Sequence, residues 1–222
     1  MSDLTRSVED YLKAIYHLSP GGEAASTNEI AERLGLSAPS VSAMVRRLSD
    51  IGLLEHEPYR GVVLTEAGRR SALRVVRRHR LIEAYLVAFL GYSWDTVHDE
   101  AERLEHSVSD LLVERMAAAL GNPRFDPHGD PIPSQDGVVE ESAYTALAEV
   151  PVGETVEIRR VDTSQGERLR YLEDHGLVPG RQVTVTAHHP FDGPLVLQVG
   201  NAAEQVIGHE LAAQILCARS ER

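Results

Sequence analysis

Residues 27–56 read TNEIAERLGLSAPSVSAMVRRLSDIGLLEH, and this stretch decides the fold of the N-terminal part of the chain. Apolar residues recur twice at helical spacing, first up to Gly35 and then up to Gly52, and each glycine is suited to end a helix. The second helix starts after Ser37, a strong N-cap residue, and holds Pro39 in its first turn, where the missing N–H group costs little. The stretch therefore predicts a helix-turn-helix.

The residues on either side extend this motif to a winged helix. Apolar positions between residues 5 and 19 predict one helix before it. After it, residues 53–56 and 62–64 read as two short strands, which a turn at residues 58–61 joins into a hairpin. One helix, a helix-turn-helix and a small hairpin, in this order, make up a winged helix-turn-helix.

The second helix of the motif is the candidate DNA-recognition helix. A major groove about 12 Å wide admits one helix, and the N-terminal turns of that helix contact the base edges. Val41, Val45 and Leu48 are spaced to face the core. Small side chains on the opposite side of the helix allow close approach to bases, and arginines there suit phosphates. The alternative to DNA binding is a winged helix that contacts another protein. The candidate DNA-contacting residues, with the hairpin tip included, are Ser37, Pro39, Ser40, Ser42, Ala43, Arg47, Tyr59 and Arg60.

The charge of the chain is divided unevenly. The net charge is −12, which by itself argues against binding to nucleic acid. Residues 1–80, however, hold 12 Lys and Arg against 10 Asp and Glu, whereas residues 81–222 hold 10 against 24. A mildly basic module on an acidic body can bind DNA, and we expect its non-specific affinity to be weak and sensitive to salt.

Composition excludes several classes of protein. Of the 222 residues, 42% are hydrophobic and 25% are charged, which is ordinary globular usage and excludes wholesale disorder. No apolar run reaches the roughly 18–20 residues that span a bilayer, and the polar N-terminus has no hydrophobic secretion segment. The single cysteine, Cys217, excludes a disulfide scaffold and a thiolate zinc site within one chain. We expect a soluble, cytoplasmic protein with no membrane partner.

The remainder of the chain predicts a helical part followed by a small β domain. A long helix covers residues 66–90, and a further helix runs from about residue 93 to residue 120, with an interruption near residues 96–98. Residues 121–140 hold four prolines and three glycines, which predicts a linker. Beyond the linker, short apolar strands alternate with glycines, and this pattern predicts a small β-barrel.

A second group of residues has the composition of a metal site. Four residues of the stretch HDEAERLEH fall within an arc of roughly 100° on a continuous helix, and these are His98, Glu102, Glu105 and His106. The preceding helix adds the i,i+4 pair His79 and Glu83, and the first helix adds Glu9 and Asp10. Imidazole and carboxylate ligands without sulfur favour a hard divalent first-row metal. A solvated amphipathic helix face is the alternative interpretation of the same residues.

Several motifs together carry a family resemblance. EDYLKAIYHL (9–18), the helix-turn-helix, YRGVVLTEAG (59–68), RRHRLIEAYL (77–86), HDEAERLEH (98–106) and DPHGDPIP (126–133) resemble the DtxR/MntR family of metal-dependent transcriptional repressors. The match covers about residues 1–133. In the C-terminal part, VPVGETVEIRRV and HGLVPGRQVTV resemble the FeoA-like (SH3-like) domain of the longer family members.

The resemblance implies two metal sites per subunit. By motif, an ancillary site takes His79, Glu83 and His98, and a primary site takes Asp10, Glu102, Glu105 and His106. Iron-sensing members have methionine and cysteine where this chain has Asp10 and Glu102, so the resemblance implies Mn(II), with Fe(II) as the alternative. Lys13 stands where the short manganese sensors have an acidic ligand, which argues against their close two-manganese arrangement. The Pro-rich surroundings of His128 favour a structural role for that residue.

The resemblance also implies the fold class, which is α+β and multidomain. Residues 1–72 are expected to form a winged helix-turn-helix DNA-binding domain, and residues 73–140 a helical dimerisation and metal-binding domain that ends in the Pro-rich linker. Residues 141–222 are expected to form a FeoA-like domain, a small SH3-like β-barrel.

The expected function is repression of metal-uptake genes. We expect a homodimer, not an enzyme, that binds palindromic double-stranded operator DNA when loaded with metal, with up to two dimers per operator. A metallohydrolase could use the same ligands, but the sequence has no nucleophile motif, Gly-rich phosphate loop or HExxH motif. A metal-independent DNA-binding adaptor, whose FeoA-like domain recruits a partner, is a further alternative.

Overall fold

The computed structural model describes residues 4–19, 21–57, 61–140, 142–200 and 203–219. The chain forms two compact units. The first unit consists of Met1–His79, Arg103–Leu112 and Pro133–Val139, and the second of Arg80–Glu102, Val113–Ile132 and Glu140–Arg222.

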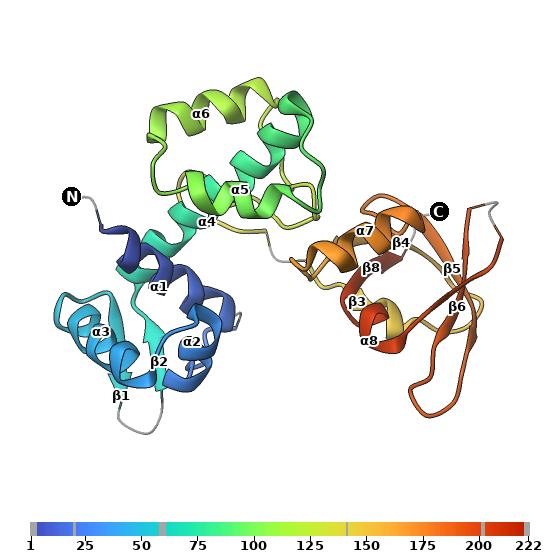
Figure 1. Ribbon diagram of the computed structural model, residues 1–222, viewed down its shortest axis with the longest axis horizontal. Coiled ribbons are helices and arrows are strands. Elements are labelled where there is room, and N and C mark those ends of the chain that lie inside the picture. The colour runs from blue at the N-terminus through green and yellow to red at the C-terminus, as the bar shows by residue number, and fades with distance from the viewer. Residues whose placement is uncertain (1–3, 20, 58–60, 141, 201–202, 220–222) are drawn as a thin grey trace. The chain divides into compact units, whose positions relative to one another are not determined.

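The first unit contains the winged helix (Figure 1). Its elements are α1 (Arg6–Leu18), α2 (Thr27–Leu34), α3 (Ala38–Asp50), β1 (Leu54–Glu57), β2 (Gly61–Leu64) and the first turns of α4 (Glu66–Leu90). Ser26 and Glu29 form a capping box, in which each side chain accepts a hydrogen bond from the backbone N–H of the other, and this box starts α2. Ser37 caps α3 as predicted, because its hydroxyl accepts from the N–H of Ser40.

The apolar stripes of these helices meet in one core. Gly35 follows α2 with φ of 64°, a left-handed conformation that glycine adopts without strain, so the chain turns directly into α3. In the hairpin, Leu54 lies opposite Leu64 and His56 opposite Val62. The predicted winged helix-turn-helix is confirmed. Its buried residues include Leu12, Ile15, Ile30, Val41, Val45, Leu48, Leu54 and Val62.

The helices that follow agree with the sequence prediction in part. α4 spans Glu66–Leu90 as expected, and the hydroxyl of Thr65 accepts from the N–H of Gly68 at its start. The next stretch forms two helices, α5 (Val97–Leu104) and α6 (Asp110–Ala119). The interruption therefore lies at residues 105–109, and the prediction that placed it near residues 96–98 was wrong.

A new helix start follows this break. The hydroxyl of Ser109 accepts from the N–H of Leu112, which satisfies a free donor in the first turn of α6. As a result, Glu105 and His106 lie in the turn after α5 and do not share a helix face with His98 and Glu102, contrary to the expectation for a continuous helix.

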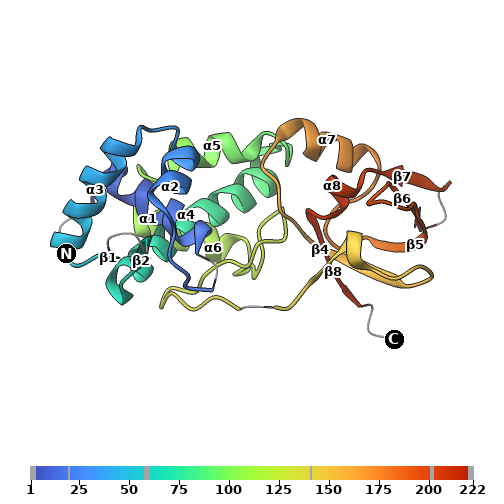
Figure 2. The ribbon, with the colours of Figure 1, turned by 90° about the horizontal axis from the view of Figure 1, so that it is seen from below.

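The C-terminal part of the second unit is an antiparallel sheet with short helices beside it (Figure 2). The strand order is β3-β8-β4-β5-β6-β7, and all neighbouring strands are antiparallel. The elements are β3 (Thr145–Ala146), η1 (Leu147–Glu149), β4 (Thr155–Val161), α7 (Gly166–Asp174), β5 (Gln182–His188), β6 (Leu195–Val199), β7 (Gln205–Ile207), α8 (His209–Ala212) and β8 (Ile215–Arg219).

The core of this sheet is apolar and includes Ile158, Leu169, Val185 and Leu197, together with Trp94, which precedes α5. The expected fold class, winged helix, helical part and SH3-like sheet, is thus confirmed. Within the described ranges, every helix is too short or too polar to cross a membrane.

Candidate metal centres and DNA-binding surface

Three predicted ligands converge in the first unit. Asp10 lies on α1, whereas Glu105 and His106 lie in the turn between α5 and α6. Nε2 of His106 is 2.8 Å from Oδ1 of Asp10 and 3.2 Å from Oε1 of Glu105. One ligand atom from each residue lies within 4.8 Å of the other two. These residues form the first cluster (Asp10, Glu105 and His106), which joins α1 to a turn that is distant in the sequence.

The imidazole of His106 is oriented for a cation. Its Nδ1 is 2.7 Å from Oε2 of Glu9, and because a carboxylate only accepts, Nδ1 carries the proton. Among the described residues, Nε2 has no partner with hydrogen-bond geometry, although two carboxylate oxygens lie beside it. In the neutral ring the Nε2 lone pair faces these oxygens, and a divalent cation satisfies this arrangement. Two carboxylates and one imidazole fit a hard metal such as Mn(II).

Lys13 brings a positive charge to the same region. Its ammonium lies 2.9 Å from Oε1 and 2.8 Å from Oε2 of Glu105. Nδ1 of His79 is 3.2 Å from the Lys13 ammonium and 2.5 Å from Oε2 of Glu105. Since Lys13 and Glu105 are both buried, the ammonium offsets the carboxylate charge when no metal is bound.

A second cluster lies entirely in the second unit. It consists of Glu83 on α4 together with Asp126 and His128 in the Pro-rich loop, and all three side chains are buried. Oε2 of Glu83 is 3.5 Å from Nδ1 of His128. Nε2 of His128 lies 2.8 Å from the carbonyl oxygen of Trp94 and donates to it, so the Nδ1 lone pair of the neutral ring faces the carboxylates.

The second cluster holds protons in the absence of metal. Burial raises the pKa of Asp126 to about 7, and the charges of Asp130 and Glu83 act in the same direction. Burial by itself would lower the pKa of His128, but the hydrogen bond and charge of Glu83 and the charge of Asp126 outweigh it and raise the pKa to about 9. A divalent cation can replace these protons, because it neutralises the same carboxylates.

The sequence pattern did not single out Asp126 and favoured a structural role for His128. The signal that could have found them is an acid and an imidazole, separated by one proline, in a Pro-rich stretch. Their approach to Glu83 could not be foreseen, because helical periodicity carries no information about which helix a distant loop contacts.

The loop of the second cluster also contacts the C-terminal sheet. The carbonyl of His128 accepts from the N–H of Val161 on β4. Asp130 pairs with Arg80 of α4 at 3.0 Å and with Arg160 of β4 at 3.1 Å. Gly129 has φ of 87°, and a Cβ placed on it would lie 1.9 Å from the carbonyl oxygen of Arg159. The loop therefore packs tightly against β4 as well as α4.

The remaining predicted ligands are divided between the units. His98 lies 3.1 Å from Oε1 of Glu83 through Nδ1 and 3.9 Å from Glu102 through Nε2. His79 belongs to the first unit, where it contacts Lys13 and Glu105. The structure thus places Glu83 next to His98 on one side and His128 on the other.

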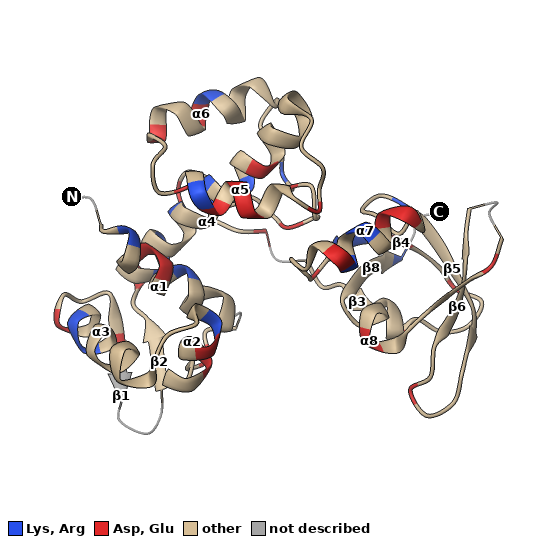
Figure 3. Ribbon diagram, viewed as in Figure 1, with Lys and Arg blue, Asp and Glu red and all other residues tan. Residues whose placement is uncertain are grey.

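The candidate recognition helix presents the expected surface. Figure 3 shows cationic residues on α3 and acidic residues on α1. Pro39, Ser40, Ala43 and Arg47 are exposed, Ser42 is half-buried, and Ser37 caps the helix. Tyr59 and Arg60, the predicted contacts at the tip of the hairpin, lie outside the described residues.

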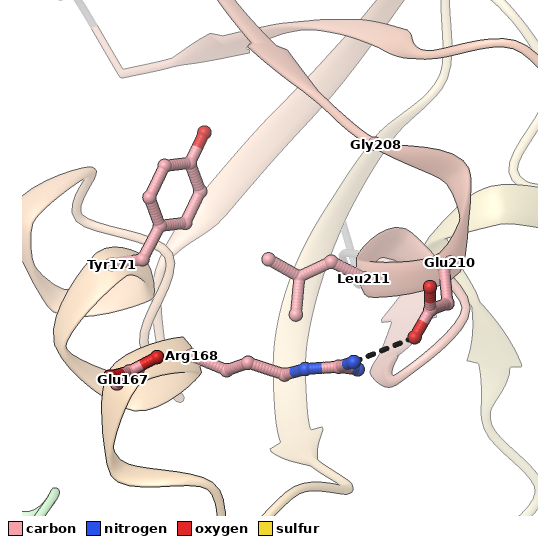
Figure 4. Close-up of a pocket in the computed structure, with 6 residues that line it drawn as sticks. All are labelled: Glu167, Arg168, Tyr171, Gly208, Glu210 and Leu211. Carbon is pink, nitrogen blue, oxygen red and sulfur yellow. Dashed lines mark hydrogen bonds and ion pairs between the residues drawn. The ribbon is translucent and has the colours of Figure 1, made fainter.

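A shallow pocket of about 390 Å³ lies between α7 and α8 (Figure 4). Arg168 pairs with Glu210 across it at 2.7 Å, and the hydroxyl of Tyr171 donates to the carbonyl of Val206. In the part of the chain that the structure describes, the residues that line this pocket belong to none of the groups with metal-ligand spacing.

Known proteins match all three parts of the chain. Residues 3–62 match the iron dependent repressor N-terminal DNA binding domain, residues 65–134 the iron dependent repressor metal binding and dimerisation domain, and residues 145–219 the FeoA domain. The chain belongs to the DtxR/MntR family of metal-dependent transcriptional repressors. Because members of this family are DNA-binding regulators, the metallohydrolase alternative is set aside.

Individual relatives within the DtxR/MntR family sense different metals. The iron-dependent repressor IdeR of Mycobacterium bovis is 36% identical over 227 residues, which covers 96% of each chain. The diphtheria toxin repressor of Corynebacterium diphtheriae is 36% identical and covers 76% of this chain and 80% of its own. A solved manganese-dependent transcriptional repressor in complex with manganese has a TM-score of 0.89 at 40% identity and covers 96% of this chain and 100% of its own. Membership of the family therefore shows that the chain is a metal-dependent transcriptional repressor, but it does not identify the metal.

Proposed function

We propose that this repressor is activated by Mn(II), which binds at the first cluster, and that it then represses metal-uptake genes. The observation that carries the proposal is the convergence of Asp10, Glu105 and His106, with Nε2 of His106 facing two carboxylates. In this cluster the described ligand atoms are oxygen and nitrogen only, which favours Mn(II) over softer ions.

The first cluster suggests how metal controls DNA binding. A cation held by Asp10 and by the 105–106 turn ties α1, which packs in the core of the winged helix, to the helical part. Without the metal, α1 samples more positions, so the spacing of the two recognition helices in a dimer is fixed only on DNA, at a cost in free energy. Metal and operator then raise each other's affinity by the same factor.

The second metal site of each subunit is proposed at Glu83, Asp126 and His128, with His98 beside Glu83. We prefer this assignment because its three side chains are buried and lie within one unit. The ancillary site implied by the resemblance, at His79, Glu83 and His98, stays a prediction. The Lys13 ammonium on Glu105 supports a single metal at the first cluster.

The active form is proposed to be a homodimer on a palindromic operator. Phe89 and Leu90 at the end of α4 and Tyr92 after it are exposed, and they lie in the part of the chain that matches a dimerisation domain. A dimer with two-fold symmetry places its two recognition helices about 34 Å apart, one turn of DNA. Measuring the stoichiometry of the complex between protein and operator DNA gives the number of dimers per operator.

Metal choice is tested by operator affinity across Mn(II), Fe(II) and Co(II). Asp10 and Glu102 are the two positions where the resemblance implies sulfur ligands in iron sensors. The wild-type protein is expected to respond to Mn(II), and a variant with Asp10→Met and Glu102→Cys is expected to respond less to Mn(II) and more to Fe(II) or Co(II), because sulfur suits softer ions. Activation of the wild type by Fe(II) but not Mn(II), or the same ranking in both proteins, would contradict the manganese assignment and leave the family assignment intact.

A further inference from the structure

The side chain of Glu9 lies beside the first cluster and joins His106 to an arginine of α4. Its Oε2 is 2.7 Å from Nδ1 of His106, and its Oε1 is 3.2 Å from Nη1 of Arg78. The three side chains are 5–15% exposed. Because charges in such surroundings are weakly screened, both contacts are strong and directional.

Arg78 is held from its other side as well. Its Nε and Nη2 lie 3.2 and 3.0 Å from Oδ1 of Asp110, at the start of α6. The hydrogen bond from Arg78 keeps the pKa of Asp110 below its usual range, so this carboxylate stays charged at neutral pH. A chain of contacts therefore runs from Asp110 through Arg78 and Glu9 to the imidazole that faces the metal site.

We propose that Glu9 is a positioning residue for His106, and that Arg78 holds Glu9 in the required place. The proposal rests on the proposed function, because it needs Nε2 of His106 to bind the activating metal. A carboxylate that accepts from Nδ1 fixes the ring tautomer, limits ring rotation and makes Nε2 more basic. Glu9 and Asp10 are neighbours on α1, so this helix supplies both a ligand and the support of another ligand.

The hydrogen bond is tested first in the metal-free protein, by nitrogen-15 NMR of the His106 side chain. The wild type is expected to show the proton on Nδ1, and Glu9→Ala is expected to lose this preference. Glu9→Gln should retain it, because the amide oxygen can accept the same hydrogen bond. Arg74→Ala is the matched control, since Arg74 contacts Asp110 at 2.7 Å but has no described contact with Glu9.

The role toward metal is tested by Mn(II) affinity, measured by electron paramagnetic resonance. Glu9→Ala is expected to lower the affinity by about 10–100-fold, Arg78→Ala is expected to lower it less, and Arg74→Ala is expected to leave it unchanged. Wild-type tautomer and wild-type affinity in Glu9→Ala would overturn the proposal, as would an equal loss in Arg74→Ala and Arg78→Ala.

Failure of the proposed function would look different. In that case His106→Ala would bind Mn(II) as tightly as the wild type, while Glu9→Ala still changed the tautomer of His106. The hydrogen bond would then stand, and its role in metal binding would be overturned.

Discussion

The ammonium of Lys13 lies 2.8 Å from Oε2 and 2.9 Å from Oε1 of Glu105, whose side chain is fully buried. Glu105 also faces Nε2 of His106. A metal at the first cluster must therefore share this carboxylate with a fixed positive charge. Lys13 should stabilise the metal-free protein and at the same time reduce its affinity for metal.

Replacing Lys13 by Met should separate these two effects. Loss of the ammonium leaves Glu105 buried without its cation, which is expected to destabilise the metal-free protein by about 3–5 kcal/mol. Mn(II) should bind more tightly and restore much of the lost stability. Thermal unfolding with and without Mn(II), together with a binding titration, measures both effects. Lys13→Arg is the charge-conserving control, and unchanged affinity and stability in Lys13→Met would contradict this account.

Proton release should accompany metal binding at the second cluster. At pH 7 both His128 and Asp126 hold protons, because the cluster raises their pKa values to about 9 and about 7. Binding of Mn(II) should displace these protons, and calorimetry in buffers of different ionisation enthalpy counts them. His128→Gln should release fewer protons. Equal proton release by the two proteins would show that His128 is not a ligand.

The same pKa values predict how the metal-free protein responds to pH. Because the pKa of His128 is raised from about 6.5 to about 9, its contribution to stability is complete below pH 6.5 and is lost as the pH rises to 9. The raised pKa of Asp126 acts in the same direction between its ordinary value and about 7. Melting temperatures of the metal-free protein should fall over this range and fall less in His128→Gln. A flat profile in the wild type would argue against the buried ion pair.

Much of the fold could be predicted from the sequence because the signals are local. The recognition helix combines a cap at Ser37, an apolar stripe and a terminal glycine, and each of these acts within a few residues. The break before α6 was misplaced because α5 ends at Leu104 and Ser109 caps the next helix, although no Gly or Pro stands between them to mark a break in the sequence.

The sites could be predicted only in part. Asp10 and His106 carry a family motif, so their roles could be proposed before the structure was known. The approach of Asp126 and His128 to Glu83, and that of Lys13 to Glu105, are contacts between distant segments. Such contacts depend on how the chain folds back on itself, and no spacing rule encodes them.

Because the 126–130 loop packs closely on β4, we expect substitution of Gly129 to lower the stability of the protein more than substitution of an unpacked glycine. Ala at this position would place its Cβ 1.9 Å from the Arg159 carbonyl oxygen in a backbone conformation with φ of 87°. Gly153 has almost the same φ, 88°, but nothing within 4 Å of its Cβ position. Gly153→Ala should therefore lose about 1–2 kcal/mol from backbone strain, whereas Gly129→Ala should lose more and bind less metal. Equal stability loss, measured by urea unfolding, would rule out the close contact.

Arginine and serine on α3 should affect DNA binding in different ways. Arg47→Ala is expected to weaken binding to all sequences and to reduce the slope of log affinity against log salt by about one unit, because one phosphate contact is lost. Ser42→Val is expected to affect the operator more than scrambled DNA, because it changes the surface of α3 that we propose to face the bases. Fluorescence anisotropy with both DNAs at several salt concentrations separates the two effects. An unchanged salt slope in Arg47→Ala would show that Arg47 does not contact the DNA backbone.

The central claim, that a metal at the first cluster switches on operator binding, is tested most directly by titrating Mn(II) into protein mixed with labelled operator. The operator is first selected from random-sequence DNA in the presence of Mn(II), and wild type is compared with His106→Ala. Wild-type affinity should rise by about 5–150-fold from chelator to saturating Mn(II), the usual range of such coupling, and His106→Ala should show no rise. Equal affinity of the wild type in chelator and in Mn(II), or a full response by His106→Ala, would contradict the account.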